Sequence, residues 1–390
     1  MSISAAICTY NRRELAMSCL ESLLAQDADL AGITVVDNAS EDGTRDALER
    51  AFGDRVVVIS SNYNRGSSGG FHLAIENACR ESSDYVLLLD SDTELAPGAL
   101  AAMVNYLEEN PDVWVVGPKI YWPGTERRVQ TFGTRIDWAT TELIQGYRDL
   151  AEGTAAQIIG TLEVDCVLAC CALVRREVFA KVGNIDPQFF VYMDDVEWCW
   201  RVKEAGGRLA MISAAEVIHH CSNRRVKKNH FTTYYCWRNE VFFFLTHCPN
   251  EHRIKMESGL LHRICRAVAT SEALGLVNAG QVIETAAWEG ATGQLGERDF
   301  GDLKVEIDSP SPFLSTPEGS SCIHKVNSIF EMDNDDLDDL SWYRDDFGKS
   351  IQGVDLKAAL PIYQEAFDRV QERFTPLFKV CSERQNRMIP

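Results

Sequence analysis

Two aspartates, Asp90 and Asp92, come directly after a short run of apolar residues from Tyr85 to Leu89. Such a run is typical of a strand that is buried on both faces of a parallel sheet. Ligands of open α/β sheets bind at the carboxyl ends of the strands, where both side chains would lie. Carboxylate oxygens suit Mg²⁺ or Mn²⁺, which can carry a diphosphate. The alternative is a solvated turn, because Asp, Ser and Thr also favour turns.

A second acidic group, Asp194 and Asp195, stands at the start of a predicted helix. Apolar residues at Val196, Trp200 and Val202 predict that one face of this helix is buried. A carboxylate at the mouth of a cleft can act as a general base. The alternative is a helix cap, since the helix dipole favours negative charge in the first turn.

An imidazole ends the apolar run that leads to His219 and His220. A lone histidine is more often structural. At the end of a strand beside Asp90 and Asp92, however, it could complete a metal site.

The first hundred residues alternate between strands and helices. The expected strands are Ile3 to Cys8, Ile33 to Val36, Val56 to Ser60, and Tyr85 to Leu89. This alternation predicts a doubly wound, mostly parallel α/β sheet. Each strand ends in polar residues, and in a parallel sheet these should line one cleft. They are Thr9, Asn11 and Arg12; Asp37 and Asn38; Asn64; and Asp90 and Asp92.

Gly66, Gly69 and Gly70 are expected to form a loop before a helix from Phe71 to Arg80. The segment lacks the Lys-Ser or Lys-Thr of a P-loop and the spacing of the dinucleotide fingerprint. Its glycines would let the backbone approach a ligand closely, although a purely structural loop fits equally well.

The composition is that of an acidic globular protein. The chain has 390 residues, 45% of them hydrophobic, a net charge of -20 and a pI near 4.8. This charge argues against a nucleic-acid partner, whose phosphates need a basic surface. Thirteen cysteines without a CxxC motif predict reduced thiols in a cytoplasmic compartment. Neither a signal peptide nor a membrane-spanning segment is expected.

We expect three parts along the chain: a nucleotide-binding catalytic domain over residues 1–225, a helical extension that packs on it over residues 226–300, and an acidic region of unknown role over residues 301–390. A basic run, Arg224 to Lys228, is either a solvated loop or a loop that closes over phosphate. An acidic run from Glu331 to Asp339 is expected to be solvated.

Several of these motifs, taken in order over roughly residues 3–245, resemble the inverting family 2 glycosyltransferases of the GT-A fold. Within that family, the chain resembles the branch of bacterial galactofuranosyl- and rhamnosyltransferases. The motifs are Thr9 to Arg12, Val36 to Asn38 with Gly43-Thr44, Asn64 to Phe71, Leu89 to Asp92, Leu173 to Arg176 with Gly183, Phe189 to Asp195, His219, and Tyr234 to Asn239.

The resemblance implies a role for each matching residue. Asp90, Asp92 and His219 would hold Mn²⁺ or Mg²⁺, and Asp195 would be the base that deprotonates the acceptor hydroxyl. The expected donor- and acceptor-binding residues are Thr9, Asn11, Arg12, Asp37, Asn64, Gly69, Gly70, Ser91, Asp194 and Glu197. Glu197 stands where the family often has Asp, so the choice of base within this acidic cluster stays open. The choice between His219 and His220 as the metal ligand also stays open.

The implied activity moves galactofuranose from its UDP donor, or rhamnose from its dTDP donor, onto a hydroxyl of a growing bacterial surface glycan. The acceptor would be lipid-linked, which implies a cytoplasmic enzyme with transient contact with the inner membrane. The oligomeric state is left open. A nucleotidyltransferase is the enzymatic alternative, and a catalytically inactive nucleotide-sugar-binding protein is the other.

Overall fold

The computed structural model describes residues 1–124, 127–148, 158–220, 230–273, 276–300 and 356–386. The chain forms two compact units: unit 1 comprises Met1–Asp137 and Glu142–Asn223, and unit 2 comprises Trp138–Thr141 and Arg224–Pro390. The basic run from Arg224 to Lys228 and the acidic run from Glu331 to Asp339 lie outside the described residues.

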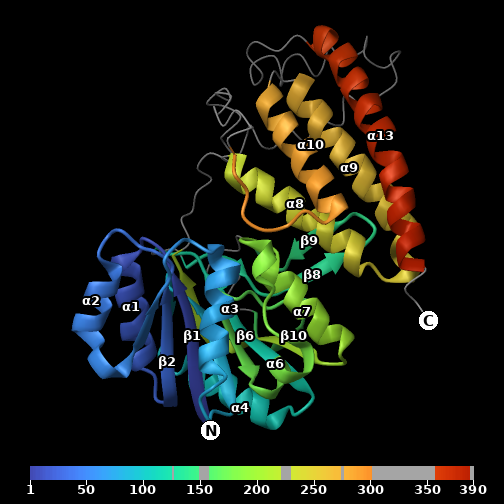
Figure 1. Cartoon of the computed structure of the whole chain (residues 1–390). Helices are drawn as coiled ribbons and strands as arrows, with labels where there is room; N and C mark the ends of the chain where they lie inside the picture. Colours follow the sequence, from blue (N-terminus) through green and yellow to red (C-terminus); the bar gives the residue numbers. More distant parts are fainter. Residues whose placement is uncertain (125–126, 149–157, 221–229, 274–275, 301–355, 387–390) are drawn as a thin grey trace. The chain divides into compact units, whose positions relative to one another are not determined.

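Unit 1 begins with the expected parallel βα units (Figure 1). The strands are β1 (Ser2–Thr9), β2 (Asp29–Asp37), β3 (Val57–Ser60) and β4 (Tyr85–Asp90), and the helices between them are α1 (Arg13–Leu24), α2 (Thr44–Phe52) and α3 (Gly66–Ala78), with a 3-10 turn η1 (Gly53–Arg55). They lie in the order β4-β1-β2-β3, each pair parallel. The predicted α/β class is thus confirmed.

The second half of the sheet is mixed, in the order β10-β12-β6-β11-β4. Its elements are β5 (Thr93–Leu95), α4 (Ala99–Glu109), β6 (Val113–Tyr121), β7 (Val129–Thr131), β10 (Thr161–Glu163), β11 (Cys171–Arg175), α6 (Glu177–Val182), η2 (Pro187–Phe189), α7 (Asp194–Glu204) and β12 (Arg208–His219). The hairpin of β8 (Thr134–Asp137) and β9 (Glu142–Gln145) forms a second, two-stranded sheet. Since β11 is antiparallel to both β4 and β6, β6 and its parallel neighbour β12 run in the same direction as β4.

The expected glycine-rich loop is instead the first turn of helix α3. A Cβ on Gly70 would lie 2.1 Å from Cys8 Sγ, and one on Gly66, whose φ is +71°, would lie 1.9 Å from the Phe190 carbonyl oxygen. The glycines therefore let α3 pack closely against β1 and against the segment before α7. The prediction of a loop at these glycines was wrong. Glycine has a low helix propensity, but here the close packing of the helix requires residues without a Cβ.

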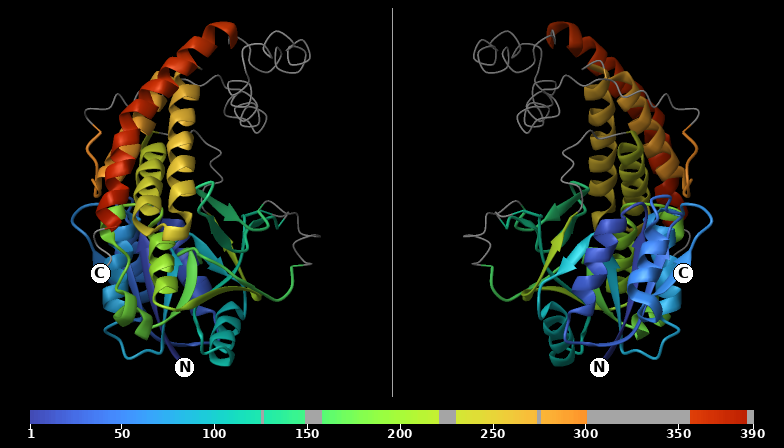
Figure 2. Two further views of the ribbon diagram at one scale, coloured as in Figure 1. Left: turned by 90° about the vertical axis from the view of Figure 1, so that its right-hand side faces the viewer. Right: turned by 90° about the vertical axis from the view of Figure 1, so that its left-hand side faces the viewer.

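Unit 2 consists mainly of helices that run alongside one another, as Figure 2 shows. They are α8 (His230–His247), α9 (Arg253–Ala273), α10 (Val277–Thr292) and α13 (Leu356–Asn386), with a 3-10 turn η3 (Asn250–His252). Helix α10 packs on α8 and α9, and α13 packs on α9. Trp138 lies among the aromatic rings of α8, with centroids 5.6 Å from Phe243 and 5.5 Å from Phe244. The expected helical C-terminal extension is confirmed.

Helix α13 was not foreseen in the sequence. Arg369 and Arg373 form ion pairs with Glu272 of α9 and Glu284 of α10. These contacts tie the C-terminal helix to the other helices of unit 2. None of the helices that the structure describes is long and apolar enough to cross a membrane.

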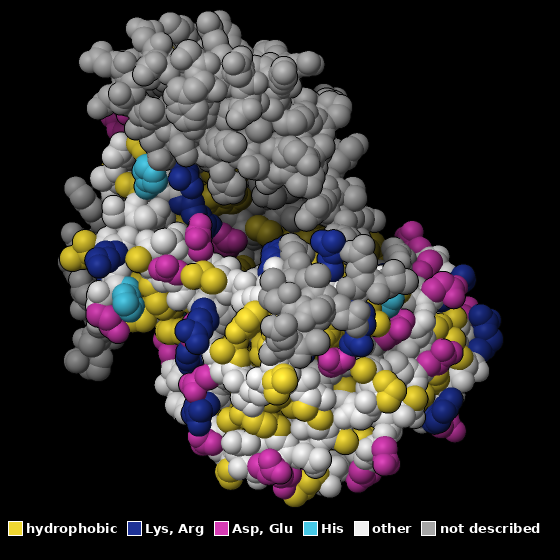
Figure 3. Space-filling view, turned by 180° about the vertical axis from the view of Figure 1, so that it is seen from behind, with side chains coloured by type: hydrophobic (Ala, Val, Ile, Leu, Met, Phe, Trp, Pro, Cys, Tyr) yellow, Lys and Arg dark blue, Asp and Glu magenta, His cyan; other side chains and the backbone are white. Residues whose placement is uncertain are grey.

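The face in Figure 3 mixes acidic, basic and hydrophobic side chains, and the coloured residues form no continuous basic stripe there.

Replacing Gly66 by Ala should destabilise unit 1 much more than replacing Gly98 by Ala. Both glycines have positive φ, +71° and +80°, so both variants carry the strain of a left-handed alanine, about 1–2 kcal/mol. Only at Gly66 would the new Cβ also collide with backbone, which adds roughly 1–3 kcal/mol. Urea unfolding of both variants measures the difference. Equal losses would contradict the packing role of Gly66.

Candidate functional site

The polar residues that the sequence singled out lie along one edge of the sheet. Thr9, Asp37 and Asp90 are the last residues of β1, β2 and β4, and His219 is the last residue of β12. Because these strands run in the same direction, their carboxyl ends share an edge. The structure thus brings together side chains that are far apart in the sequence.

Asp90, Asp92 and His219 form the centre of this edge. Each offers one ligand atom, and these atoms lie within 4.8 Å of one another. His219 Nε2 is 3.5 Å from Asp90 Oδ2 and 3.3 Å from Asp92 Oδ1. The neighbouring His220 instead faces Glu94, with Nε2 3.0 Å from Oε1. Of the two histidines, His219 is therefore the one that faces both aspartates.

Strand β5 explains how Asp92 reaches His219. It runs antiparallel to the end of β12, with Thr93 opposite His219 and Leu95 opposite Val217. The backbone N–H of His220 also donates to the Asp92 carbonyl oxygen at 2.8 Å. This pairing places Asp92 beside the imidazole.

The donor set fits a divalent cation. Two carboxylates and a neutral imidazole nitrogen are ligands that Mn²⁺ and Mg²⁺ sites use, the imidazole suiting Mn²⁺ better. Asp92 is only 3% exposed, and its second oxygen forms an ion pair with the guanidinium of Arg12. Two carboxylates this close are stabilised when a positive charge lies between them, and a metal ion would supply that charge here.

The other ring nitrogen of His219 has a partner that the sequence did not suggest. Nδ1 lies 3.1 Å from Gln130 Oε1 on β7. None of the motifs or periodic patterns described above includes Gln130.

Asp194 and Asp195 lie in the first turn of α7. The Asp195 carboxylate accepts hydrogen bonds from the backbone N–H groups of Ala169, at 3.2 Å, and of Val196, at 2.8 Å. Burial raises the pKa of Asp195 in spite of these bonds, and the charge of Asp90 raises it further. Burial, together with the charge of Asp195, raises the pKa of Asp194 to about 7. Raised pKa values are a property of carboxylates that transfer protons.

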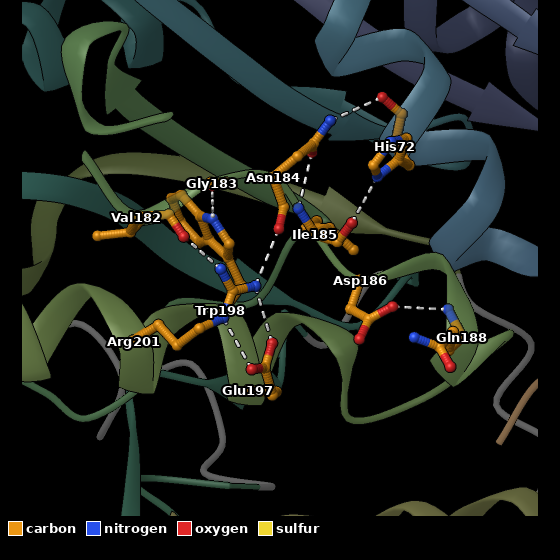
Figure 4. Close-up of polar contacts among 10 residues, drawn as sticks. All are labelled: His72, Val182, Gly183, Asn184, Ile185, Asp186, Gln188, Glu197, Trp198 and Arg201. Carbon is orange, nitrogen blue, oxygen red and sulfur yellow. Dashed lines mark hydrogen bonds and ion pairs between the residues drawn. The ribbon is translucent and has the colours of Figure 1, made fainter. Parts of the chain in front are cut away.

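Glu197, in the same turn of α7, is paired with an arginine. Arg201, one turn later, donates to both of its carboxylate oxygens at 2.7 and 2.9 Å. The same guanidinium donates to the carbonyl oxygens of Val182 and Asn184, as Figure 4 shows. Glu197 therefore helps to fix the connection between α6 and α7.

The loops after β1, β2 and β3 are joined by side-chain amides. Asn11 Oδ1 accepts from the backbone N–H of Glu41 at 2.7 Å, and Asn38 donates to Asn64 Oδ1 at 2.8 Å. Asn64 Oδ1 also accepts from the Gly66 N–H at 2.9 Å. These bonds join the loops at this edge of the sheet.

Two of the remaining predicted residues lie at the ends of adjacent strands. Thr9 and Asp37 are register partners, and both are buried. No described residue hydrogen-bonds to the Thr9 hydroxyl. Ser91, which lies between Asp90 and Asp92 in the sequence, is also buried.

Comparison with known proteins agrees with this geometry. Residues 4–183 match the family model of "Glycosyl transferase family 2". The N-acetylglucosaminyl-diphospho-decaprenol L-rhamnosyltransferase of Mycobacterium tuberculosis (strain ATCC 25618 / H37Rv) is 26% identical over 212 residues, which are 48% of this chain and 66% of that protein. The match thus spans just under two thirds of that relative.

Two further proteins are similar. Galactofuranosyltransferase GlfT1 of Mycolicibacterium smegmatis (strain ATCC 700084 / mc(2)155) is 24% identical over 227 residues, 58% of this chain and 73% of that protein. The crystal structure of GalNAc-T7 with UDP, GalNAc and Mn²⁺ superposes with a TM-score of 0.50 and 15% identity, covering 62% of this chain and 47% of that one. This likeness shows the fold, and the GT-A prediction is confirmed.

Replacing Asp194 by Asn should remove part of the pH dependence of stability. The pKa of Asp194 is about 7 in the native protein against an ordinary value of 3.8, so the native state keeps a proton that the unfolded state releases between these values. Retention of this proton favours the native state at low pH, and this contribution to the free energy of unfolding is lost as the pH rises towards about 7. The metal-free variant should therefore gain stability relative to wild type between about pH 5 and pH 8. Urea unfolding of both proteins at pH 5 and pH 8 tests this expectation. The same difference in the free energy of unfolding between variant and wild type at both pH values would contradict it.

Proposed function

We propose that this chain, whose residues 4–183 match the model of glycosyl transferase family 2, is a metal-dependent, inverting glycosyltransferase. The observation that carries the proposal is the convergence of Asp90, Asp92 and His219 at the strand ends of this domain. A nucleotide-sugar donor would bind along the same edge, where open α/β sheets bind their ligands.

The metal would be Mn²⁺ or Mg²⁺, held by Asp90, Asp92 and His219. Bound there, it would offset the charge that develops on the departing nucleoside diphosphate. The GalNAc-T7 structure, which has the same fold, was determined with UDP and Mn²⁺.

Asp195 is the proposed general base. It would accept the proton of the acceptor hydroxyl while the acceptor oxygen bonds to the anomeric carbon and the bond from that carbon to the diphosphate oxygen breaks. A single displacement of this kind inverts the anomeric centre. The raised pKa of Asp195 suits it to hold this proton. Asp194, which is adjacent and buried, would bind the donor or acceptor sugar.

The nucleotide would lie against the loops after β1 to β3. Thr9 and Asp37 are proposed to hold the nucleobase, because a buried hydroxyl without a described partner and a buried carboxylate lie side by side there. Arg12, half-exposed and already paired with Asp92, is placed to meet the diphosphate. Asn11, Asn64, Gly69, Gly70 and Ser91 would shape the rest of the donor site. Glu197 would act on α7 through Arg201.

The proposed donors are UDP-galactofuranose and dTDP-rhamnose, since the chain is similar to a galactofuranosyltransferase and a rhamnosyltransferase. The rhamnosyltransferase is named for a lipid-diphosphate acceptor. We therefore propose a lipid-linked glycan acceptor and transient contact of the enzyme with the inner face of the cell membrane.

Binding of UDP or dTDP with Mn²⁺ should raise the melting temperature, because a ligand that binds only the native state stabilises it by mass action. Turnover with the matching nucleotide sugar and a synthetic lipid-linked glycan should release UDP or dTDP, measured by chromatography. Release of pyrophosphate would instead indicate the nucleotidyltransferase alternative. Binding without turnover of any sugar in a donor panel would favour the inactive binding protein.

Replacing Asp195 by Asn should lower kcat by roughly 10²–10⁴-fold, because the amide cannot accept the acceptor proton. The affinity for the nucleotide sugar, measured by calorimetry, should stay within a few-fold of wild type. Asp112→Asn is the matched control, since Asp112 is exposed and precedes β6 at the opposite edge of the sheet. Unchanged turnover in Asp195→Asn would refute the base assignment.

A further inference from the structure

Gln130, on β7, contacts the ring nitrogen of His219 that faces away from Asp90 and Asp92. We propose that Gln130 is a positioning residue that fixes the orientation and tautomer of His219, so that Nε2 presents its lone pair to a divalent cation. This inference rests on the proposed metal site and names a residue that the resemblance did not supply.

A β-bulge aims Gln130 at the site. Strand β7 pairs antiparallel with β6, where Ile120 lies opposite Thr131 and Tyr121 lies opposite Val129. Two consecutive residues of β6 thus face residues of β7 that are two apart, and Gln130 is the extra one. Such bulges redirect a side chain and are frequent beside active sites. Here the redirected amide reaches the end of β12.

The contact selects one form of the imidazole. Gln130 Oε1 lies 3.1 Å from Nδ1, and a carbonyl oxygen accepts a hydrogen bond from Nδ1–H. In the neutral ring, a proton on Nδ1 leaves a lone pair on Nε2. Nε2 is the atom that faces Asp90 and Asp92, at 3.5 and 3.3 Å.

The ring is held on both sides. His219 is 8% exposed and lies at the paired end of β12, so its backbone is fixed by β5. The Gln130 bond restricts the remaining rotation of the side chain. Partners behind a ligating histidine orient the ring, and their loss commonly lowers metal affinity 10–100-fold. A neutral amide does this without adding a negative charge to a site that already has two carboxylates.

The test measures binding of Mn²⁺ to the metal-free full-length protein by calorimetry, without donor or turnover. Gln130→Leu should weaken binding about 10–100-fold, because the carbonyl oxygen that lies 3.1 Å from Nδ1 is removed. Gln130→Glu keeps an acceptor oxygen and should bind within a few-fold of wild type. Gln145→Leu, the same change on β9, should bind Mn²⁺ as wild type does. Melting temperatures of the metal-free variants control for folding.

A double-mutant cycle assigns the effect to His219. In a His219→Asn background, Gln130→Leu should cause no further loss of affinity. Wild-type affinity in Gln130→Leu, or equal losses with Leu and Glu, would overturn the positioning role while leaving the proposed function intact. A further loss of Mn²⁺ affinity on adding Gln130→Leu to His219→Asn would also overturn the positioning role. A wild-type protein that binds neither Mn²⁺ nor Mg²⁺ would overturn both.

Discussion

The antiparallel pairing of β5 with the last residues of β12 is the constraint on which the candidate site depends. Parallel strands alone bring Asp90 and His219 to one edge, but Asp92 lies beyond the end of β4. The register of Thr93 opposite His219 turns the chain back and holds Asp92 against the imidazole. The three candidate ligands thus come from two strands and the turn between β4 and β5, and backbone hydrogen bonds hold the turn against the end of β12.

This arrangement concentrates negative charge. Asp90 and Asp92 face one another across His219, and burial raises the pKa values of Asp194 and Asp195 nearby. Carboxylates this close repel one another unless a cation or a proton intervenes. Arg12 supplies one positive charge to Asp92, and a divalent cation would supply two more. A cation bound between these carboxylates would relieve this repulsion, which is the electrostatic basis of the proposed metal site.

Strand periodicity and the polar residues at strand ends predicted the α/β sheet and the edge at which Asp90 and Asp92 lie, whereas the family resemblance assigned His219 to the same site. Three features could not be foreseen. Gln130 reaches the site through a bulge, which depends on register and leaves no pattern in the sequence. Helix α3 begins at Gly66 because the carbonyl oxygen of Phe190, a residue far away in the sequence, leaves no room for a Cβ at this position. Arg201 neutralises Glu197, although the spacing of acids alone grouped this residue with its neighbours.

The turn before α7 links the first turns of α3 and α7, which carry the proposed donor-site glycines and the proposed base. Phe190, with φ +65° and ψ −56°, lies in a strained three-residue turn closed by the Val191 N–H and the Phe189 carbonyl oxygen. Tyr192 and Met193 also have positive φ. This conformation is held from α3, because Ser68 N–H donates to the Phe190 carbonyl at 3.1 Å and Gly66 leaves room for it. The first turns of α3 and α7 are therefore fixed against each other, so a shift of the proposed donor-binding helix would also move Asp194 and Asp195.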